Sequence, residues 1–582
     1  MAQWLILLTI GLPWLGALAT WLTRNENERA QHTLAVGFSV AAGLAALGLL
    51  SQAGSGVALR IPIGGLFGDM TFVADGLGVF LAAVATVVGS LAVIFSVDYM
   101  HGDPTLGRYY ALVLLFIGAM AGLVLTNSLL FLFFFWEITA LCSYALISYF
   151  NDDPKAVAAG IEALVMTQVG GVGLLGGALL VYTSLGTYEI DAFLGAAGTL
   201  APMTLAWMAF GFLVAAAAKS AQFPFQTWLP DAMEAPTPVS ALIHAATMVN
   251  AGVYLLARFY PAFAPVPGWK TAVVAVGVIS ALIAACMALV APDLKRALAY
   301  STVSQLGYMV YAVGVGGILA SSIHLFSHAI FKALLVLGAG AVIHAVGTRD
   351  MWKMGGLGAR MPFVRIVFVI GALSLAGLPI LNGFWSKELV LEAGLVGGPG
   401  WALWGMLVGA GLTACYTLRM VWLVFYGEAR STLHAHDATP AMRVSLTLLA
   451  LGTLTSWLLA GSFGHLLEST LPFHQMHALS TAGMVLEILQ APLTWGALVV
   501  IAAGFLAWAA RSRLQGLIHA FAWFSTAAGK SFGVEGLNWL VVAATQGVAT
   551  VFRITQPGHL SWNVLGIIGG LVAVLILLTW GI

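Results

Sequence analysis

The chain has 582 residues, of which 60% are hydrophobic and 8% are charged, and its formal net charge is zero. Soluble domains carry charge on about a quarter of their residues, so this composition excludes a water-soluble fold. A chain without net positive charge is not suited to nucleic acid, and we expect the lipid bilayer as its surroundings instead.

Apolar runs long enough to cross a membrane recur from one end of the chain to the other. The first, from Trp4 to Thr23, lacks the basic segment of a cleaved signal peptide. We predict about sixteen transmembrane helices. They lie near residues 2–23, 31–52, 78–99, 108–126, 128–149, 157–183, 201–222, 239–262, 271–291, 296–316, 320–346, 362–391, 398–426, 442–464, 490–510 and 560–581.

The connection between the second and third helices, residues 53–77, contains alternating apolar and polar residues around Pro62. This pattern indicates a short hairpin outside the membrane, with the proline confining its strand to an edge.

Lysine and arginine are distributed unevenly between the two sets of loops. Loops after odd-numbered helices hold 16 of the 23 basic residues, among them Lys155 and Lys295. Loops after even-numbered helices hold three, Arg60, Arg258 and Lys270, and the other four lie inside helices. Basic residues favour the cytoplasmic side. We therefore predict that the odd loops face the cytoplasm and that both termini lie on the outer side of a bacterial or archaeal inner membrane.

One stretch places a lysine, a helix break and a histidine at membrane depth. Lys219 ends a long apolar run, and Pro224 interrupts the helix because proline lacks a backbone donor. Pro236 and Pro238 then precede an apolar helix that carries His244. Such features are costly in a membrane and mark ion or proton paths.

A second interrupted helix follows in the sequence LSLAGLPILNGFWSKE. Pro379, flanked by Gly377 and Gly383, precedes Lys387 and Glu388. The two interrupted helices are the seventh and the twelfth, five positions apart, which predicts two structural repeats of five helices. Paired broken helices of this kind indicate transporter sites.

Glu137 follows an apolar run and is the expected partner of Lys219, because each charge lowers the other's cost of burial. A static ion pair is the alternative to a functional one.

Two further charged residues lie within predicted helices. Glu162 is compatible with a structural or a functional role, and Arg419 is able to extend its charged end toward water.

His324, His328 and Lys332 are spaced four residues apart and form a stripe on one helix face. The stripe covers about 12 Å of the helix axis, a large part of the apolar core of a bilayer. Histidines titrate near neutral pH, so the stripe suits proton transfer. Zinc is the alternative for the two histidines, but no nearby Cys, Asp or Glu completes a ligand shell, so we predict no metal site.

Residues 513–556 do not fit a spanning helix. Their apolar residues are interrupted by Arg513, His519, Lys530, Glu535 and Arg553. An amphipathic helix along the cytoplasmic surface fits this pattern, whereas glycines at 529, 533 and 536 favour a loose interfacial loop. We expect the helix, because its polar and apolar residues sort onto two faces.

Four stretches carry a resemblance to a known family. They are KSAQFPFQTWLPDAMEAPTPVSALIHAATMVNAGVYLLAR, DLKRALAYSTVSQLGYM, HLFSHAIFKALL and LAGLPILNGFWSKE. They are similar to the antiporter-like membrane subunits of respiratory complex I, in particular subunit L of NADH-quinone oxidoreductase. They are also similar to the A subunits of multi-subunit Mrp-type cation/proton antiporters.

This resemblance implies an all-α polytopic fold of fourteen core helices with two inverted five-helix repeats, a lateral helix and a final anchoring helix. We accordingly divide the chain into N-terminal helices (1–107), a first repeat (108–262), a second repeat (271–426), C-terminal helices (442–510), a lateral helix (513–556) and an anchoring helix (560–582).

The resemblance also implies a proton-translocation path through eight residues: Glu137, Lys219, His244, His324, His328, Lys332, Lys387 and Glu388. The first two resemble the glutamate–lysine pair of the first half-channel, and His244 its link toward the centre. The next three resemble the central relay, and the last two the exit end.

The chain departs from the family in its sixth helix. Subunit L of complex I carries a basic residue and an aspartate there, in an R-(I/V)-G-D pattern, whereas this chain has Gln168, Val169, Gly170 and Gly171. The departure favours the antiporter or membrane-hydrogenase branches. The chain nevertheless ends at Ile582, without the long C-terminal extension of antiporter A subunits.

Three functions follow from these patterns. The first is a proton-pumping subunit of a complex I-like assembly, with redox chemistry on other chains. The second is a subunit of a multi-subunit sodium/proton antiporter or of a membrane-hydrogenase-type pump. The third is a non-conducting scaffold, which the buried titratable stripe argues against. We expect no cofactor on this chain, because its three distant cysteines cannot hold an iron–sulfur cluster, and we expect neighbouring antiporter-like subunits as partners.

Overall fold

The computed structural model of the chain describes residues 1–54, 56–430 and 435–555. Thirteen helices in these ranges are long and apolar enough to cross a membrane, which confirms an all-α polytopic membrane protein. The predicted count of sixteen is not confirmed. The last of the sixteen, near residues 560–581, is also the predicted anchoring helix (560–582) and lies outside the described residues.

The N-terminal part consists of six long helices and one hairpin, and its helices lie where apolar runs predict them. They are α1 (Ala2–Leu22), α2 (Glu28–Leu50), α3 (Gly76–Tyr99), α4 (Leu106–Leu125), α5 (Leu129–Ile147) and α6 (Pro154–Leu185). Strands β1 (Val57–Ile61) and β2 (Met70–Val73) pair antiparallel, which confirms the predicted hairpin. Strand β1 ends just before Pro62, which has no N–H to donate to a ladder.

The seventh predicted helix is interrupted as expected. Helix α8 ends at Lys219, and its last carbonyls accept from groups beyond the break: Gln222 N–H bonds Ala217 O at 2.7 Å and Trp228 Nε1–H bonds Ala218 O at 3.0 Å. These bonds satisfy backbone groups that have no partner inside a helix. The elements of this region are α7 (Ile190–Ala196), α8 (Pro202–Lys219), α9 (Trp228–Asp231), α10 (Thr237–Ala241), the π-helical turn η4 (Leu242–Ala246) and α11 (Met248–Phe263).

The predicted twelfth helix is also broken. Gly377 ends the first half in the left-handed region with φ of 87°, where glycine carries no steric penalty, and the second half begins five residues later at Asn382. The elements of this region are α12 (Trp269–Val290), α13 (Leu294–Gly314), α14 (Ile318–Val346), α15 (Pro362–Ala376), α16 (Asn382–Gly397) and α17 (Gly400–Val421).

The C-terminal part contains α18 (Pro440–Thr455), α19 (Ala460–Thr470), α20 (Thr481–Gln490), α21 (Pro492–Ala509), α22 (Gln515–Ala520), α23 (Ala522–Gly529) and α24 (Val534–Thr555). The chain divides into two units, at Phe532. The region predicted as one helix over 513–556 consists of three helical segments, α22, α23 and α24, up to Thr555. Its main break lies at Phe532 and Gly533, both with positive φ, where a glycine relieves backbone strain.

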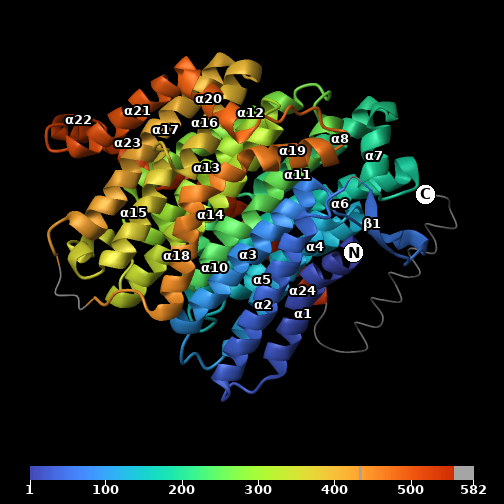
Figure 1. The fold of residues 1–582 in the computed structure, drawn as a ribbon, viewed down its shortest axis with the longest axis horizontal. Coiled ribbons are helices and arrows are strands. Elements are labelled where there is room, and N and C mark those ends of the chain that lie inside the picture. The colour runs from blue at the N-terminus through green and yellow to red at the C-terminus, as the bar shows by residue number, and fades with distance from the viewer. Residues whose placement is uncertain (55, 431–434, 556–582) are drawn as a thin grey trace. The chain divides into compact units, whose positions relative to one another are not determined.

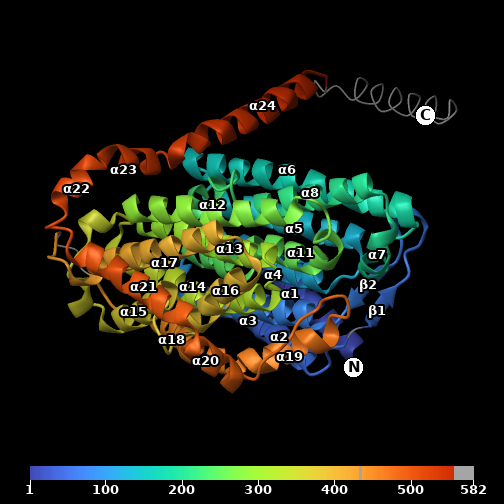
Figure 2. The same ribbon diagram turned by 90° about the horizontal axis from the view of Figure 1, so that it is seen from above.

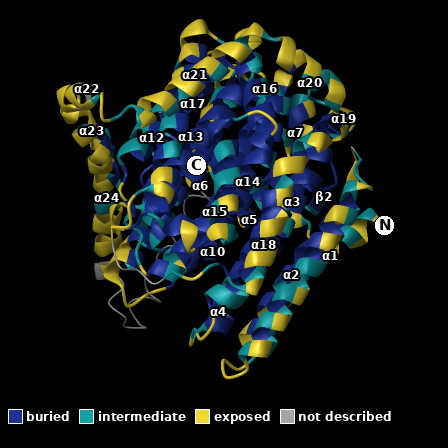
Figure 3. Ribbon diagram, turned by 60° about the vertical axis from the view of Figure 1, so that its left-hand side comes forward, coloured by how far each residue is buried: buried dark blue, intermediate teal, exposed yellow. Residues whose placement is uncertain are grey.

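Helices α13 and α14 form the interior of the first unit, with α10 and α18 beside α14 (Figure 1). Helix α6 packs along α8, as Figure 2 shows. Exposed residues run instead along α1, α2 and α18 (Figure 3). Every residue of α13 except Arg296 is buried, although its hydroxyl and amide side chains make it less apolar than its neighbours. A buried polar helix beside α14 provides hydrogen-bonding groups in the interior of the bundle.

A buried ion pair joins α3 to α11. Arg258, counted from the sequence among the loop residues, lies inside α11 and is 3% exposed. Its guanidinium bonds the carboxylate of Asp75, which also caps α3 by accepting from Gly78 N–H at 2.8 Å. Tyr254 accepts from Arg258 Nε at 3.2 Å. The pair therefore connects the start of one helix to the middle of another.

Breaking this pair on one side leaves a buried charge alone, which costs about 3–5 kcal/mol. We expect Arg258→Met to lower the thermal unfolding midpoint of the purified protein. The double variant Asp75→Asn/Arg258→Met should recover part of the loss, because asparagine keeps the helix cap and no charge remains. Equal losses in the single and double variants would show that the charge is not the cause.

Candidate functional site

The first end of the predicted path is Glu137 on α5. Its Oε2 accepts a hydrogen bond from the Gln168 side chain on α6, and its Oε1 has no hydrogen-bond partner among the described residues. A Cβ atom built on Gly171 would lie 2.6 Å from that Oε1. Gln168 and Gly171 are the two positions at which this chain departs from the family pattern. An uncharged donor and a residue without a side chain therefore lie beside the glutamate, and the carboxylate fills the space that a larger residue at 171 would need.

Lys219 does not form the expected direct pair with Glu137. No ion pair between them is present in the described parts of the chain. The ammonium donates instead to the carbonyl of Trp136 at 2.8 Å and lies 4.8 Å from the centre of the Trp136 ring. Its side chain is fully buried. Trp136, the residue before the glutamate, thus holds the Lys219 ammonium. The Glu137 carboxylate interacts with that ammonium only over a longer distance.

His244 lies in the π-helical turn η4, between the two halves of a helix. The turn ends at Thr247, whose hydroxyl bonds Leu242 O at 2.8 Å, while the Asn250 amide bonds Ala245 O at 2.7 Å. Side chains thus add hydrogen bonds to carbonyls of the irregular backbone, and Leu242 O also accepts the Thr247 N–H at 3.1 Å. Both ring nitrogens of His244 lack a hydrogen-bond partner within the described chain, and the residue is fully buried.

The three residues of the central stripe are all fully buried on α14, which packs against η4. The two nitrogens of His324 contact Ser386 Oγ at 3.0 Å and Gln305 Oε1 at 3.2 Å. Lys332 donates to the hydroxyl of Ser301. The ring of His328 has no hydrogen-bond partner in the part of the protein that the structure describes.

The last predicted pair lies on α16, beyond the second helix break. Lys387 donates to Leu375 O at 2.8 Å and lies 5.6 Å from the Tyr308 ring centre. Leu375 is in the last turn of α15, so the lysine binds the end of the broken helix, where partial negative charge collects. Glu388 is 3% exposed and hydrogen-bonded to Thr494.

Uncharged polar side chains bond three of these titratable groups, Glu137, His324 and Lys332, and sequence reasoning did not identify them. Ser301 and Gln305 come from α13, Ser386 from α16 and Gln168 from α6. Their signal in the sequence is weak, because serine and glutamine are common on any helix. Lys295, counted as a loop residue, is likewise buried and donates to Ala235 O at 2.8 Å.

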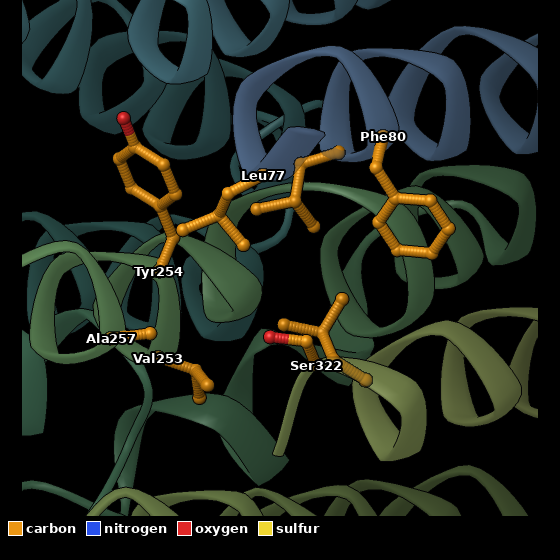
Figure 4. A pocket seen from close by; sticks show the side chains of 8 residues that line it. Leu77, Phe80, Val253, Tyr254, Ala257 and Ser322 are labelled. Atoms are coloured by element: carbon orange, nitrogen blue, oxygen red, sulfur yellow. The ribbon is translucent and has the colours of Figure 1, made fainter. Parts of the chain in front are cut away.

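A small cavity of about 10 Å³ lies between α3, α11 and α14, which is about the space for one water. Figure 4 shows that Tyr254 turns its hydroxyl away from Ser322, with Leu77 and Phe80 on the opposite wall. Apolar cavities stay dry. The cavity therefore offers no polar connection between the Arg258 region and the stripe on α14.

Comparisons with known proteins agree with this arrangement. The family described as "NADH:quinone oxidoreductase/Mrp antiporter, TM" matches residues 126–413. The family described as "NADH-Ubiquinone oxidoreductase (complex I), chain 5 N-terminus" matches residues 61–110. All eight predicted path residues lie within the first of these two matches.

Individual relatives match at different lengths. NADH-quinone oxidoreductase subunit L of Mycobacterium tuberculosis is 39% identical over 497 residues, 81% of this chain and 78% of that protein. NAD(P)H-quinone oxidoreductase chain 5 of Picosynechococcus sp. is 42% identical over 62% of this chain, and the match spans only 57% of that protein. A chain in the structure of the Mrp complex from Dietzia sp. superimposes with a TM-score of 0.83 at 28% identity, covering 100% of this chain and 63% of that one. The chain therefore belongs to the family of antiporter-like membrane subunits of NADH:quinone oxidoreductases and Mrp antiporters.

Proposed function

We propose that this chain is a proton-translocating membrane subunit of a complex I-like respiratory assembly. The observation that carries this proposal is the set of titratable groups on α5, α8, η4, α14 and α16, which are buried except for the half-buried Glu137. Several of them bond hydroxyl or amide side chains. Ionisable residues inside a membrane are costly and are found mainly where ions move. Redox chemistry would belong to other subunits.

The contacts of the lysines suggest how protons would move. Lys332 donates to the Ser301 hydroxyl, and a hydroxyl both donates and accepts, so it is able to pass a proton onward. Lys219 and Lys387 donate to backbone carbonyls, which hold an ammonium without neutralising it. A change in the distance to Glu137 or Glu388 changes the free energy of the lysine proton, since opposite charges attract strongly at low dielectric. Movement of Glu137 or Glu388 would therefore load or release the proton of Lys219 or Lys387.

Two positions in this path depend on water. The rings of His244 and His328 have no protein partner among the described residues. Buried polar groups are almost always hydrogen-bonded to protein or to water. We infer that water reaches both rings during transport and completes the link between the first half of the path and the stripe on α14.

The partners and surroundings follow from the same proposal. The chain would lie in a bacterial or archaeal inner membrane beside other antiporter-like subunits. The distribution of basic residues supports a cytoplasmic position for the odd loops and an outer position for both termini. The division into two inverted repeats and the placement of the lateral helix along the cytoplasmic surface stay predictions.

A second candidate function is that of one of the subunits in a sodium/proton antiporter. It is favoured by Gln168 and Gly171, which replace the charged pair expected in subunit L, and by the TM-score of 0.83 with a chain of an Mrp complex. Proton movement that requires external sodium would support this candidate. Proton movement that follows substrate oxidation without sodium would support the first.

Replacement of a path lysine should abolish proton translocation, because the ammonium is the group that carries the proton. We expect Lys219→Ala and Lys332→Ala each to reduce translocation to background in membrane vesicles that carry the intact complex. Lys270→Ala is the matched control, since Lys270 is exposed. Normal translocation in well-assembled Lys219→Ala and Lys332→Ala vesicles would support the scaffold function instead.

Gly171→Ala should lower translocation without loss of the folded protein. The added methyl would lie 2.6 Å from Glu137 Oε1, a mobile end that moves aside, so the carboxylate rather than the helix changes position. Gly176→Ala is the control on the same helix, because nothing lies within 4 Å of a Cβ there. Both alanines favour the helix equally. Equal translocation in both variants would contradict a role for the position of Glu137.

The orientation predicts opposite accessibility of two exposed lysines, Lys155 at the start of α6 and Lys270 at the start of α12. In a protein without native cysteines, we expect Lys270→Cys to react with an impermeant maleimide on intact cells. Lys155→Cys should react only after lysis. Labelling of both from the same side would overturn the proposed orientation.

A further inference from the structure

Three metal-ligating atoms converge where α2 begins and the turn between α3 and α4 passes over it. Glu28 Oε1 lies 2.8 Å from His101 Nδ1 and 3.2 Å from His32 Nε2. All three atoms lie within 4.8 Å of one another, and no other group of three such residues does so in the described ranges of the chain. This cluster has no role in the proposed proton path.

The local structure explains why these side chains meet. Asn27 caps α2 by accepting from Ala30 N–H, so the helix begins at Glu28. Glu28 and His32 are four residues apart and therefore lie on the same face, one turn from each other. The connection after α3 turns at Gly102, whose φ is 80°, and its N–H donates to Glu28 Oε1 at 2.9 Å. That turn brings His101 to the carboxylate.

We propose that Glu28, His32 and His101 bind a divalent transition-metal ion, with zinc as the favoured ion. Two imidazole nitrogens and one carboxylate oxygen are a ligand set of zinc sites that keep one position open. Tetrahedral bonds of about 2.0–2.2 Å place ligand atoms about 3.3 Å apart. The separations of 2.8 and 3.2 Å are close to that spacing, and the two histidine nitrogens lie within 4.8 Å of each other. His101 is 76% exposed, so water has access to the fourth position.

A hydrogen bond behind His32 supports this assignment. The Tyr110 hydroxyl on α4 lies 2.7 Å from His32 Nδ1, and Tyr110 is fully buried. A proton held on Nδ1 by that hydroxyl leaves the lone pair of Nε2 directed at the cluster. Histidines that bind metals almost always have such a partner on the other ring nitrogen.

The consequence of binding is a connection between two separate parts of the chain. The metal would join the first turn of α2 to the turn between α3 and α4, beside the basic residues Arg24 and Arg29. The exposed fourth position and the exposed His101 suit an ion that enters and leaves. The alternative is a hydrogen-bonded ion-pair cluster of one carboxylate and two histidines, which needs no metal.

The metal content of the purified intact complex distinguishes a metal site from an ion-pair cluster that binds no metal. After removal of metals by a chelator and dialysis against zinc, we expect wild type to hold one more zinc ion per chain than His101→Ala. Tyr110→Phe should bind zinc roughly 10- to 100-fold more weakly than wild type. His465→Ala is the matched control, because His465 and Glu468 form an exposed pair at 3.5 Å that joins no third ligand among the described residues.

Cobalt absorption and thermal unfolding test the same site independently of metal content. Cobalt in place of zinc should give the intense visible absorption of a low-coordinate site in wild type and in His465→Ala but not in His101→Ala. Zinc should raise the unfolding midpoint of wild type and leave that of His101→Ala unchanged. Equal zinc content in wild type and His101→Ala, or a zinc effect that His465→Ala removes, would overturn the proposal.

Discussion

The high cost of an unpaired charge in an apolar interior is the constraint on which the rest of this structure depends. Each buried lysine of the path has an oxygen partner: Trp136 O for Lys219, Ser301 Oγ for Lys332 and Leu375 O for Lys387. None of these partners is a carboxylate. The lysines are therefore solvated by the protein without being neutralised, and their protons stay exchangeable.

The two helix breaks supply what this arrangement needs. A continuous helix uses its carbonyls internally, whereas an end leaves several free. Leu375 O is such a group, and the Lys387 ammonium binds it across the gap between α15 and α16. At the other break the freed carbonyls of α8 bind Gln222 and Trp228. Irregular backbone is tolerated at these depths because it is enclosed by protein.

Polar helix α13 has a corresponding role beside α14. It provides Ser301 and Gln305 to the stripe, and its interior position removes any need for an apolar surface toward lipid. The same reasoning explains why α13 is not among the thirteen helices that are apolar enough to cross a membrane: a helix surrounded by other helices can be polar.

The sequence by itself determined the membrane class, the positions of the long helices, both helix breaks and the eight titratable residues. These features depend on local composition, such as apolar length, proline and charge within an apolar run. Tertiary structure alone decided which groups meet. It placed Gln168 rather than Lys219 on Glu137, and it buried Arg258 and Lys295 instead of leaving them in loops. It also brought His101 to Glu28 and His32. Partners from different helices depend on packing geometry, and spacing along one chain does not encode the distance between two helices.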